Sequence, residues 1–173
     1  MKLKLKHVSF GLFALLLLLS VGYHWLVPKG IQQAPEVSFN IVDGRTLSLS
    51  QLTGRPVLVV FWATTCESCI KEIPHLIDLY KELAPRGLEI IAVAMAYDPP
   101  NQVMEMRQRI PIPYPIAIDV QGKIAQAFAE VRLTPTTFLI DPQGQVVIQK
   151  TGLLDMKEMR SKLQSMLPAS TGG

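Results

Sequence analysis

Short apolar runs recur along this chain between residues 37 and 149, and turn-forming residues separate them. The runs at residues 57–62 and 88–95 are mainly apolar and rich in β-branched side chains, which is the pattern of strands buried on both faces. Residues 37–49 alternate between apolar and polar positions around Asp43-Gly44, and this predicts a hairpin. Further strands are predicted at residues 114–118, 136–140 and 145–149, the last two joined by the turn Asp141-Pro142-Gln143-Gly144.

Apolar residues at helical spacing fill the intervals between these runs. The first such stretch stops at Pro85-Arg86-Gly87, which favours the end of a helix. The last begins at Asp155, and Glu158 three residues later completes a capping-box pattern. Helices are therefore predicted at residues 66–84, 99–109, 122–130 and from residue 155 onward.

The alternation of strands and helices predicts one α/β domain with a mixed central sheet over residues 37–168. A chain of 173 residues is long enough to bury one core of this kind. We expect a short tether at residues 31–36 before the domain and a flexible tail at residues 169–173 after it.

The chain opens with a different pattern, a long apolar run. Residues 8–27 contain no Asp, Glu, Lys or Arg, and Lys2, Lys4 and Lys6 precede them. About 20 apolar residues span a bilayer as a helix, and lysines on one flank favour the cytoplasmic side for that flank. Residues 1–30 are therefore predicted to be a single-pass anchor in the inner (cytoplasmic) membrane, with a cytoplasmic N-terminus and the domain in the periplasm or outside the cell.

A cleaved signal peptide is the alternative reading of this segment. The run ends at Tyr23-His24-Trp25-Leu26-Val27 rather than at small residues, and aromatic side chains suit a membrane interface, so an uncleaved anchor is favoured. The segment also explains the excess of 17 Lys and Arg over 14 Asp and Glu. Four of those lysines precede residue 30, and the rest of the chain, with 13 basic and 14 acidic residues, gives no argument for nucleic-acid binding.

The two cysteines of the chain, Cys66 and Cys69, stand where a predicted buried strand gives way to a helix. Thr64 with Glu67 is predicted to cap that helix, which places Cys66 in its first turn. Unpaired amides and the positive end of the helix dipole favour the thiolate there, and the thiolate is the form that attacks disulfides. Cys69 returns to the same face and can close a disulfide or resolve a mixed one. The pair therefore predicts dithiol–disulfide exchange that needs no other cofactor.

Other uses of a Cys-x-x-Cys pair remain open. Structural zinc needs two more ligands, and only one histidine, His75, lies beyond the N-terminal segment. A static disulfide across so short a loop stabilises little. Two thiolates outside the cytoplasm could also hold Cu(I), as in a metallochaperone, given a third ligand. A peroxiredoxin is disfavoured, because Val59 and Ala63 occupy the Pro and Thr positions of the P-x-x-x-T-x-x-C pattern.

Two further features bear on the cysteines. Pro135, in Thr134-Pro135-Thr136, precedes a predicted strand, and an ordinary loop proline is the alternative reading. Glu72 follows Cys69 by three residues and could face the cysteines, although its position beside Lys71 is also that of a surface glutamate.

Taken together, these residues resemble the TlpA/ResA-type extracytoplasmic thioredoxin-like proteins, with the CcmG/DsbE branch close by. The resemblance spans roughly residues 35–167. It rests on Phe61-Trp62-Ala63-Thr64 before Cys66-Glu67-Ser68-Cys69, on Lys71-Glu72-Ile73-Pro74, and on Thr-Pro-Thr-Thr-Phe-Leu-Ile-Asp at residues 134–141.

The resemblance implies a thioredoxin fold, with an extra helix and strand at about residues 97–118. It implies that Cys66 is the exposed nucleophile, Cys69 the buried resolving thiol, and Pro135 a cis-proline that faces the disulfide. Thr134 would offer its backbone to a bound substrate, Trp62 and Glu67 belong to the same expected substrate-binding surface, and Glu72 would act as a proton relay. Members typically reduce specific disulfides, often in apocytochrome c or copper-site proteins, with electrons from a membrane thiol carrier.

Three residues depart from the family pattern. Thr65 stands where tryptophan commonly precedes the first cysteine, and Ser68 stands where proline is common. Glu67 places a negative charge beside Cys66, which opposes the effect of the helix dipole on the thiolate. The resemblance therefore does not fix the docking surface or the redox poise of the pair.

Overall fold

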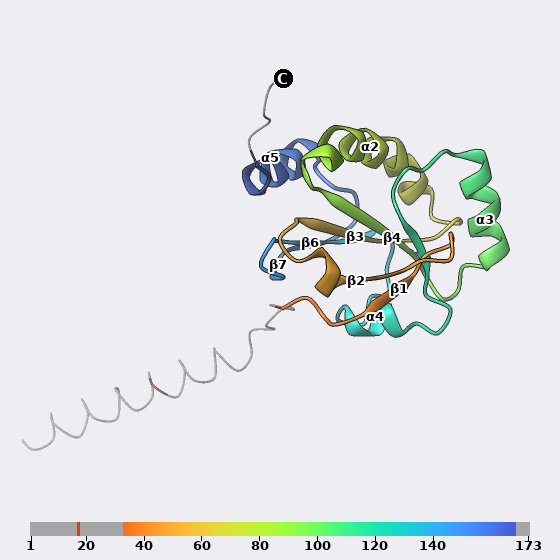
Figure 1. The fold of residues 1–173 in the computed structure, drawn as a ribbon. Helices are drawn as coiled ribbons and strands as arrows, with labels where there is room; N and C mark the ends of the chain where they lie inside the picture. The colour runs from red at the N-terminus through yellow and green to blue at the C-terminus, as the bar shows by residue number, and fades with distance from the viewer. Residues whose placement is uncertain (1–16, 18–32, 169–173) are drawn as a thin grey trace, which may run out of the picture. The chain divides into compact units, whose positions relative to one another are not determined.

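The computed structural model describes Leu17 and residues 33–168. The strands are β1 (Ser38–Asn40), β2 (Thr46–Ser48), β3 (Val57–Trp62), β4 (Glu89–Ala94), β5 (Ile116–Ile118), β6 (Thr136–Ile140) and β7 (Val146–Thr151). The helices are α2 (Glu67–Leu83), α3 (Pro100–Arg109), α4 (Lys123–Ala127) and α5 (Met156–Met166), with short 3-10 turns at Leu49–Leu52 and Ala84–Arg86. Five strands form one sheet in the order β5-β4-β3-β6-β7, and β1 and β2 form a separate hairpin (Figure 1).

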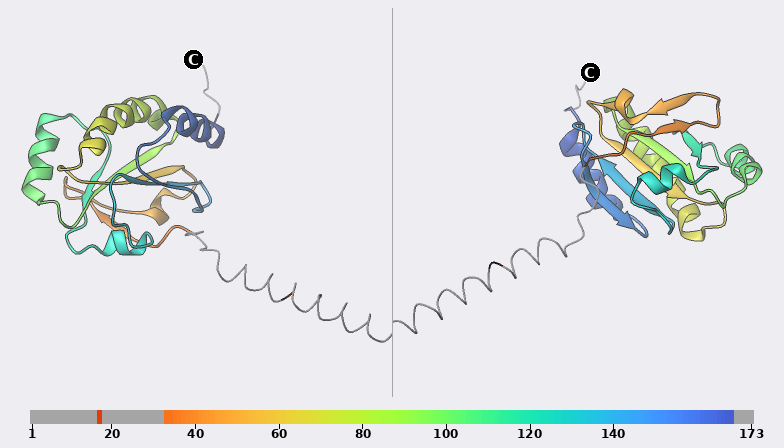
Figure 2. Two further views of the ribbon diagram at one scale, coloured as in Figure 1. Left: turned by 180° about the vertical axis from the view of Figure 1, so that it is seen from behind. Right: turned by 90° about the horizontal axis from the view of Figure 1, so that it is seen from below.

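Strand β3 lies at the centre of the sheet and contributes side chains to the hydrophobic core on each of its faces. It pairs in parallel with β4 and antiparallel with β6, so the mixed sheet predicted from the sequence is confirmed. Successive side chains of a strand point to opposite faces. Leu58 and Val60 therefore join the core beneath α2 and α5, while Val59 and Phe61 join the core beneath α4 and the hairpin (Figures 1 and 2). Burial on both faces explains why β3 is continuously apolar.

Helix α4 is shorter than the sequence predicts. It ends at Ala127 rather than at residue 130. Ala129 and Glu130, with φ of 57° and 53°, adopt the left-handed conformation and so turn the chain out of the helix.

The predicted tether at residues 31–36 overlaps the domain. Gln33 forms a β-bridge with Gln145, and the amide of Ala34 donates to the carbonyl of Gly144 at 2.9 Å. Two residues of the predicted tether thus pair with the residues just before β7. The strand pattern of residues 33–34 is too short to be recognised in the sequence.

Within Leu17 and residues 33–168, no helix has the length and apolar character needed to cross a membrane. The predicted anchor at residues 1–30, apart from Leu17, and the predicted tail at residues 169–173 lie outside the described residues.

Candidate active site

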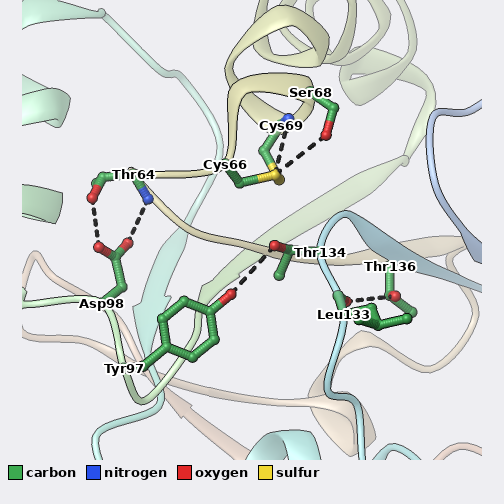
Figure 3. Close-up of a disulfide and its surroundings, with 9 residues drawn as sticks. All are labelled: Thr64, Cys66, Ser68, Cys69, Tyr97, Asp98, Leu133, Thr134 and Thr136. Atoms are coloured by element: carbon green, nitrogen blue, oxygen red, sulfur yellow. Dashed lines mark hydrogen bonds between the residues drawn. A yellow bond between two sulfur atoms is a disulfide. The ribbon is translucent and has the colours of Figure 1, made fainter.

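Cys66 occupies the N-cap position of α2, directly after β3 and its connecting turn. Its sulfur accepts a hydrogen bond from the amide of Cys69 at 3.2 Å and lies 3.4 Å from the hydroxyl of Ser68 (Figure 3). The prediction that Thr64 caps this helix is therefore wrong, and Cys66 precedes the first turn instead of lying within it. The amide contact still brings the sulfur to the positive end of α2, where a thiolate is stabilised.

The two cysteines form a disulfide, and they differ in exposure. The Cα atoms of Cys66 and Cys69 are 5.2 Å apart. Cys66 is half-buried, whereas Cys69 is buried in the core beneath α2. An approaching partner therefore meets Cys66 first.

The buried carboxylate of Asp98 holds the segment that leads into Cys66. Asp98 lies in the loop between β4 and α3. One of its oxygens accepts the amide of Thr64 at 2.7 Å and the other accepts the hydroxyl of Thr64 at 2.5 Å (Figure 3). The second of these bonds uses the Thr64 hydroxyl that the sequence assigned to the helix cap, and the two together hold the turn after β3.

The second side of the site is the loop before β6. The peptide bond between Thr134 and Pro135 is cis, as the resemblance implied for Pro135. Thr134 is half-buried, and its hydroxyl lies 3.3 Å from the hydroxyl of Tyr97 (Figure 3). Thr134 and Cys66 border one open hollow of about 510 Å³, whose other lining residues are Thr65, Glu67, Ser68, Lys71, Tyr97 and Leu153.

Glu72 lies in the buried stripe of α2, one helical turn after Cys69. It is 3% exposed, so the alternative of a surface glutamate is wrong. Its Oε1 accepts the amide of Leu154 at 2.8 Å, and its Oε2 has no hydrogen-bond partner among the described residues. Burial raises the pKa of Glu72, and the Leu154 amide and then His75 oppose that rise. Burial, with a smaller effect from the charge of Glu72, also raises the pKa of Tyr114.

The remaining predicted site residues lie in two different environments. Glu67 is exposed on the rim of the hollow and forms an ion pair of 2.6 Å with Lys71. Trp62 is buried in the core beneath α2 and does not line the hollow. The structure therefore brings Cys66, Glu67 and Thr134 to one surface, with Cys69, Glu72 and Pro135 buried and Trp62 outside this surface.

Sequence reasoning missed Tyr97 and Asp98 as site residues. A signal for them exists in the order of the elements. Strands β3 and β4 are parallel neighbours, so the residues that follow their carboxyl ends meet at one edge of the sheet. Cys66 follows β3 and Asp98 follows β4, which places them on that common edge.

Across Leu17 and residues 33–168, possible metal ligands occur at many positions. There, no three His, Cys, Asp or Glu side chains lie together as a group that could hold a metal ion.

Comparison with known proteins places the chain among relatives of one kind. Residues 31–149 match the model of the AhpC/TSA family. The thiol-disulfide oxidoreductase ResA of Bacillus subtilis (strain 168) is 31% identical over 140 residues, which cover 81% of this chain and 77% of the relative. ResA of Geobacillus thermodenitrificans (strain NG80-2) is 31% identical over 176 residues, covering 97% of this chain and 100% of the relative.

A solved structure shows the same fold. The crystal structure of a thiol:disulfide interchange protein, a thioredoxin family protein from Chlorobium tepidum TLS, superposes with a TM-score of 0.71 at 26% sequence identity. The match covers 81% of this chain and 99% of that chain.

Proposed function

This chain belongs to the AhpC/TSA family and is a thiol–disulfide oxidoreductase of the TlpA/ResA type, and from this premise we propose that it reduces disulfides in specific partner proteins. One observation carries the proposal. A half-buried Cys66 is bonded to a buried Cys69, and Cys66 shares a hollow with Thr134 of the cis-proline loop. A partner sulfur can approach Cys66 there, while Cys69 is protected from outside attack.

The exchange proceeds in two balanced steps. The Cys66 thiolate attacks one sulfur of the substrate disulfide, and the other substrate sulfur leaves as a thiolate that takes up a proton. The Cys69 thiolate then attacks the Cys66 sulfur, closes the Cys66–Cys69 disulfide and releases the second substrate thiolate. Two electrons pass to the substrate, and a membrane thiol carrier returns them to the cysteine pair.

The setting of this reaction is part of the proposal. The lysines and the apolar run of residues 1–30 support a retained single-pass anchor, with the domain outside the cytoplasm. The resemblance to the TlpA/ResA type supports apocytochrome c or copper-site proteins as substrates. Thr134 would present its backbone to the substrate, with Pro135 behind it and Glu67 on the rim.

The reduction potential of the cysteine pair tests the direction of the reaction. We expect a value of about −270 mV or lower, the range of a reductant such as thioredoxin. The purified protein is equilibrated with dithiothreitol or glutathione buffers and the fraction of free thiol is measured. A value near about −120 mV, the range of the oxidant DsbA, would contradict the reductase function.

Glu72 is proposed to hold and pass the proton that Cys69 exchanges, since both side chains are buried one helical turn apart on α2. Its raised pKa means that the folded protein binds this proton more tightly than the unfolded chain does. The free energy of unfolding of the oxidised protein should therefore fall as the pH rises from 4.5, the ordinary value, through the folded pKa of Glu72.

Glu72→Gln should remove this decline and shift the pH profile of cysteine alkylation in the reduced protein. Urea unfolding of the oxidised protein and alkylation rates, both followed across pH 4 to 9, measure the two effects. Glu105→Gln is the matched control, because Glu105 is an exposed glutamate paired with Arg109 on α3. Identical profiles for wild type and Glu72→Gln would exclude the proton role.

A further inference from the structure

Two large apolar side chains are exposed inside the hollow that contains Cys66. Tyr97 is 57% exposed and Leu153 is 52% exposed, and both line that hollow. A single exposed apolar residue on a protein surface is ordinary. Two of them at the mouth of one reactive sulfur, from segments far apart in sequence, indicate a contact surface for a partner.

The backbone at each of these side chains is tied to the cysteine-bearing segment through a buried carboxylate. Tyr97 immediately precedes Asp98, whose carboxylate binds the amide and the hydroxyl of Thr64, two residues before Cys66. Leu153 immediately precedes Leu154, whose amide donates to Glu72, three residues after Cys69. Asp98 and Glu72 thus hold the backbone next to Tyr97 and next to Leu153 close to the cysteine pair.

Further contacts hold the Tyr97 ring and the backbone next to Leu153. The hydroxyl of Tyr97 lies 3.3 Å from that of Thr134, so its ring stands toward the cis-proline loop (Figure 3). The residue before Leu153, Gly152, donates its amide to the carbonyl of Pro135 at 2.8 Å. These contacts position the Tyr97 ring and the Leu153 backbone before a partner arrives, which reduces the conformational entropy lost on binding.

Charge contributes little to selection in this hollow. Its two charged side chains, Glu67 and Lys71, neutralise each other in an exposed ion pair of 2.6 Å. A segment that enters the hollow therefore meets no net charge, and within this mixed lining Tyr97 and Leu153 offer the apolar surface that favours an apolar side chain.

We propose that Tyr97 and Leu153 are specificity-determining residues. Their side chains contact a large apolar side chain next to the reactive cysteine of the substrate. The occupant is a disulfide-bearing segment of the substrate protein, because whatever occupies the hollow must bring its sulfur to Cys66. The inference rests on the proposed reductase function and names the class of substrate for it. A cysteine beside Phe or Leu is preferred over one beside a small polar residue.

This preference is tested with two peptide disulfides that differ only in the residue after each cysteine. That residue is Phe in one peptide and Ser in the other. The reduced full-length protein is mixed with each peptide disulfide, and the rate at which the protein is oxidised is measured. For each variant this rate is divided by the oxidation rate of the same variant with bis(2-hydroxyethyl) disulfide. Wild type should prefer the Phe peptide about tenfold, within the range that one apolar contact supplies. Tyr97→Ala and Leu153→Ser should bring the ratio of the oxidation rates with the Phe peptide and the Ser peptide close to one.

Two control variants sharpen the result. Tyr97→Phe keeps the ring without its hydroxyl and should keep most of the preference. Val120→Ser removes an apolar side chain that is 68% exposed and lies outside the hollow, and it should keep the full preference. A wild type without preference, or one whose preference survives Tyr97→Ala and Leu153→Ser, overturns the inference and leaves the reductase function standing. A wild type that reacts with none of the three disulfides overturns both.

Discussion

Cys66→Ser should abolish disulfide exchange, lowering turnover by about 10³-fold or more, as the loss of a covalent nucleophile does. Cys66 is the half-buried cysteine at the start of α2, and its sulfur accepts the amide of Cys69. A serine hydroxyl at this position is not ionised at neutral pH and cannot attack a disulfide. Cys69 cannot replace Cys66, since it is buried beneath α2. Insulin reduction with dithiothreitol as electron donor measures the loss.

The control for this variant must show that the domain still folds. Cys66→Ser should retain cooperative urea unfolding, with a midpoint close to that of wild type in its reduced form. The comparison with the reduced form matters, because the variant has no disulfide. If the folded variant still reduces insulin at a wild-type rate, Cys66 is not the nucleophile.

Cys69→Ser should convert a short-lived intermediate into a stable one. In the wild type, Cys69 is held within reach of the Cys66 sulfur, and an intramolecular attack of this kind is far faster than one by a thiol from solution. Without Cys69, the mixed disulfide between Cys66 and the substrate should persist at least about 10²-fold longer. Non-reducing electrophoresis after acid quenching, followed by mass spectrometry, measures the adducts and identifies the bound proteins.

A double variant supplies the matched control for this experiment. Cys66→Ser combined with Cys69→Ser removes both sulfurs and should form no adduct. If Cys69→Ser also forms none with a disulfide that the wild type reduces, the assigned order of the two cysteines is wrong. Adducts whose bound cysteines lie beside aromatic or aliphatic residues would also agree with the role inferred for Tyr97 and Leu153.

Much of the fold can be predicted because its strongest signals are local or periodic. Strands β3 and β6 match their predicted bounds, and both are buried along their whole length. Strand β3 is apolar throughout, and β6 joins two β-branched threonines to a run of three apolar residues, so both carry a strong local strand signal. The end of α4 could not be placed. Residues 128–130 still fit a helical pattern, but Ala129 and Glu130 adopt the left-handed conformation, which is uncommon for alanine and glutamate and which their residue types do not signal.

The site was less accessible to sequence reasoning where contacts are distant. Thr64 has the right residue type and spacing for a helix cap, but Asp98, 34 residues away, binds its hydroxyl instead. The burial of Glu72 could have been predicted from the local sequence, because helical periodicity is a stronger indication than the charged neighbour Lys71. Glu72 lies within the apolar stripe that contains Cys69, Ile73 and Leu76, so helical periodicity alone places it on the buried face.

The position of β3 between β4 and β6 also determines when the site comes into being. Cys66 follows β3, whose parallel partner β4 is synthesised soon after it, whereas Thr134 leads into β6 near the end of the chain. The pairing of Phe61 with Thr136 closes a long loop, and such closures are slow because of their entropy. During synthesis the two thiols therefore exist before the surface that selects their partner. The hollow beside Cys66 is complete only after β6 has paired with β3 and the segment at Leu153 has followed, so a chain that ends before β6 would carry both cysteines without it.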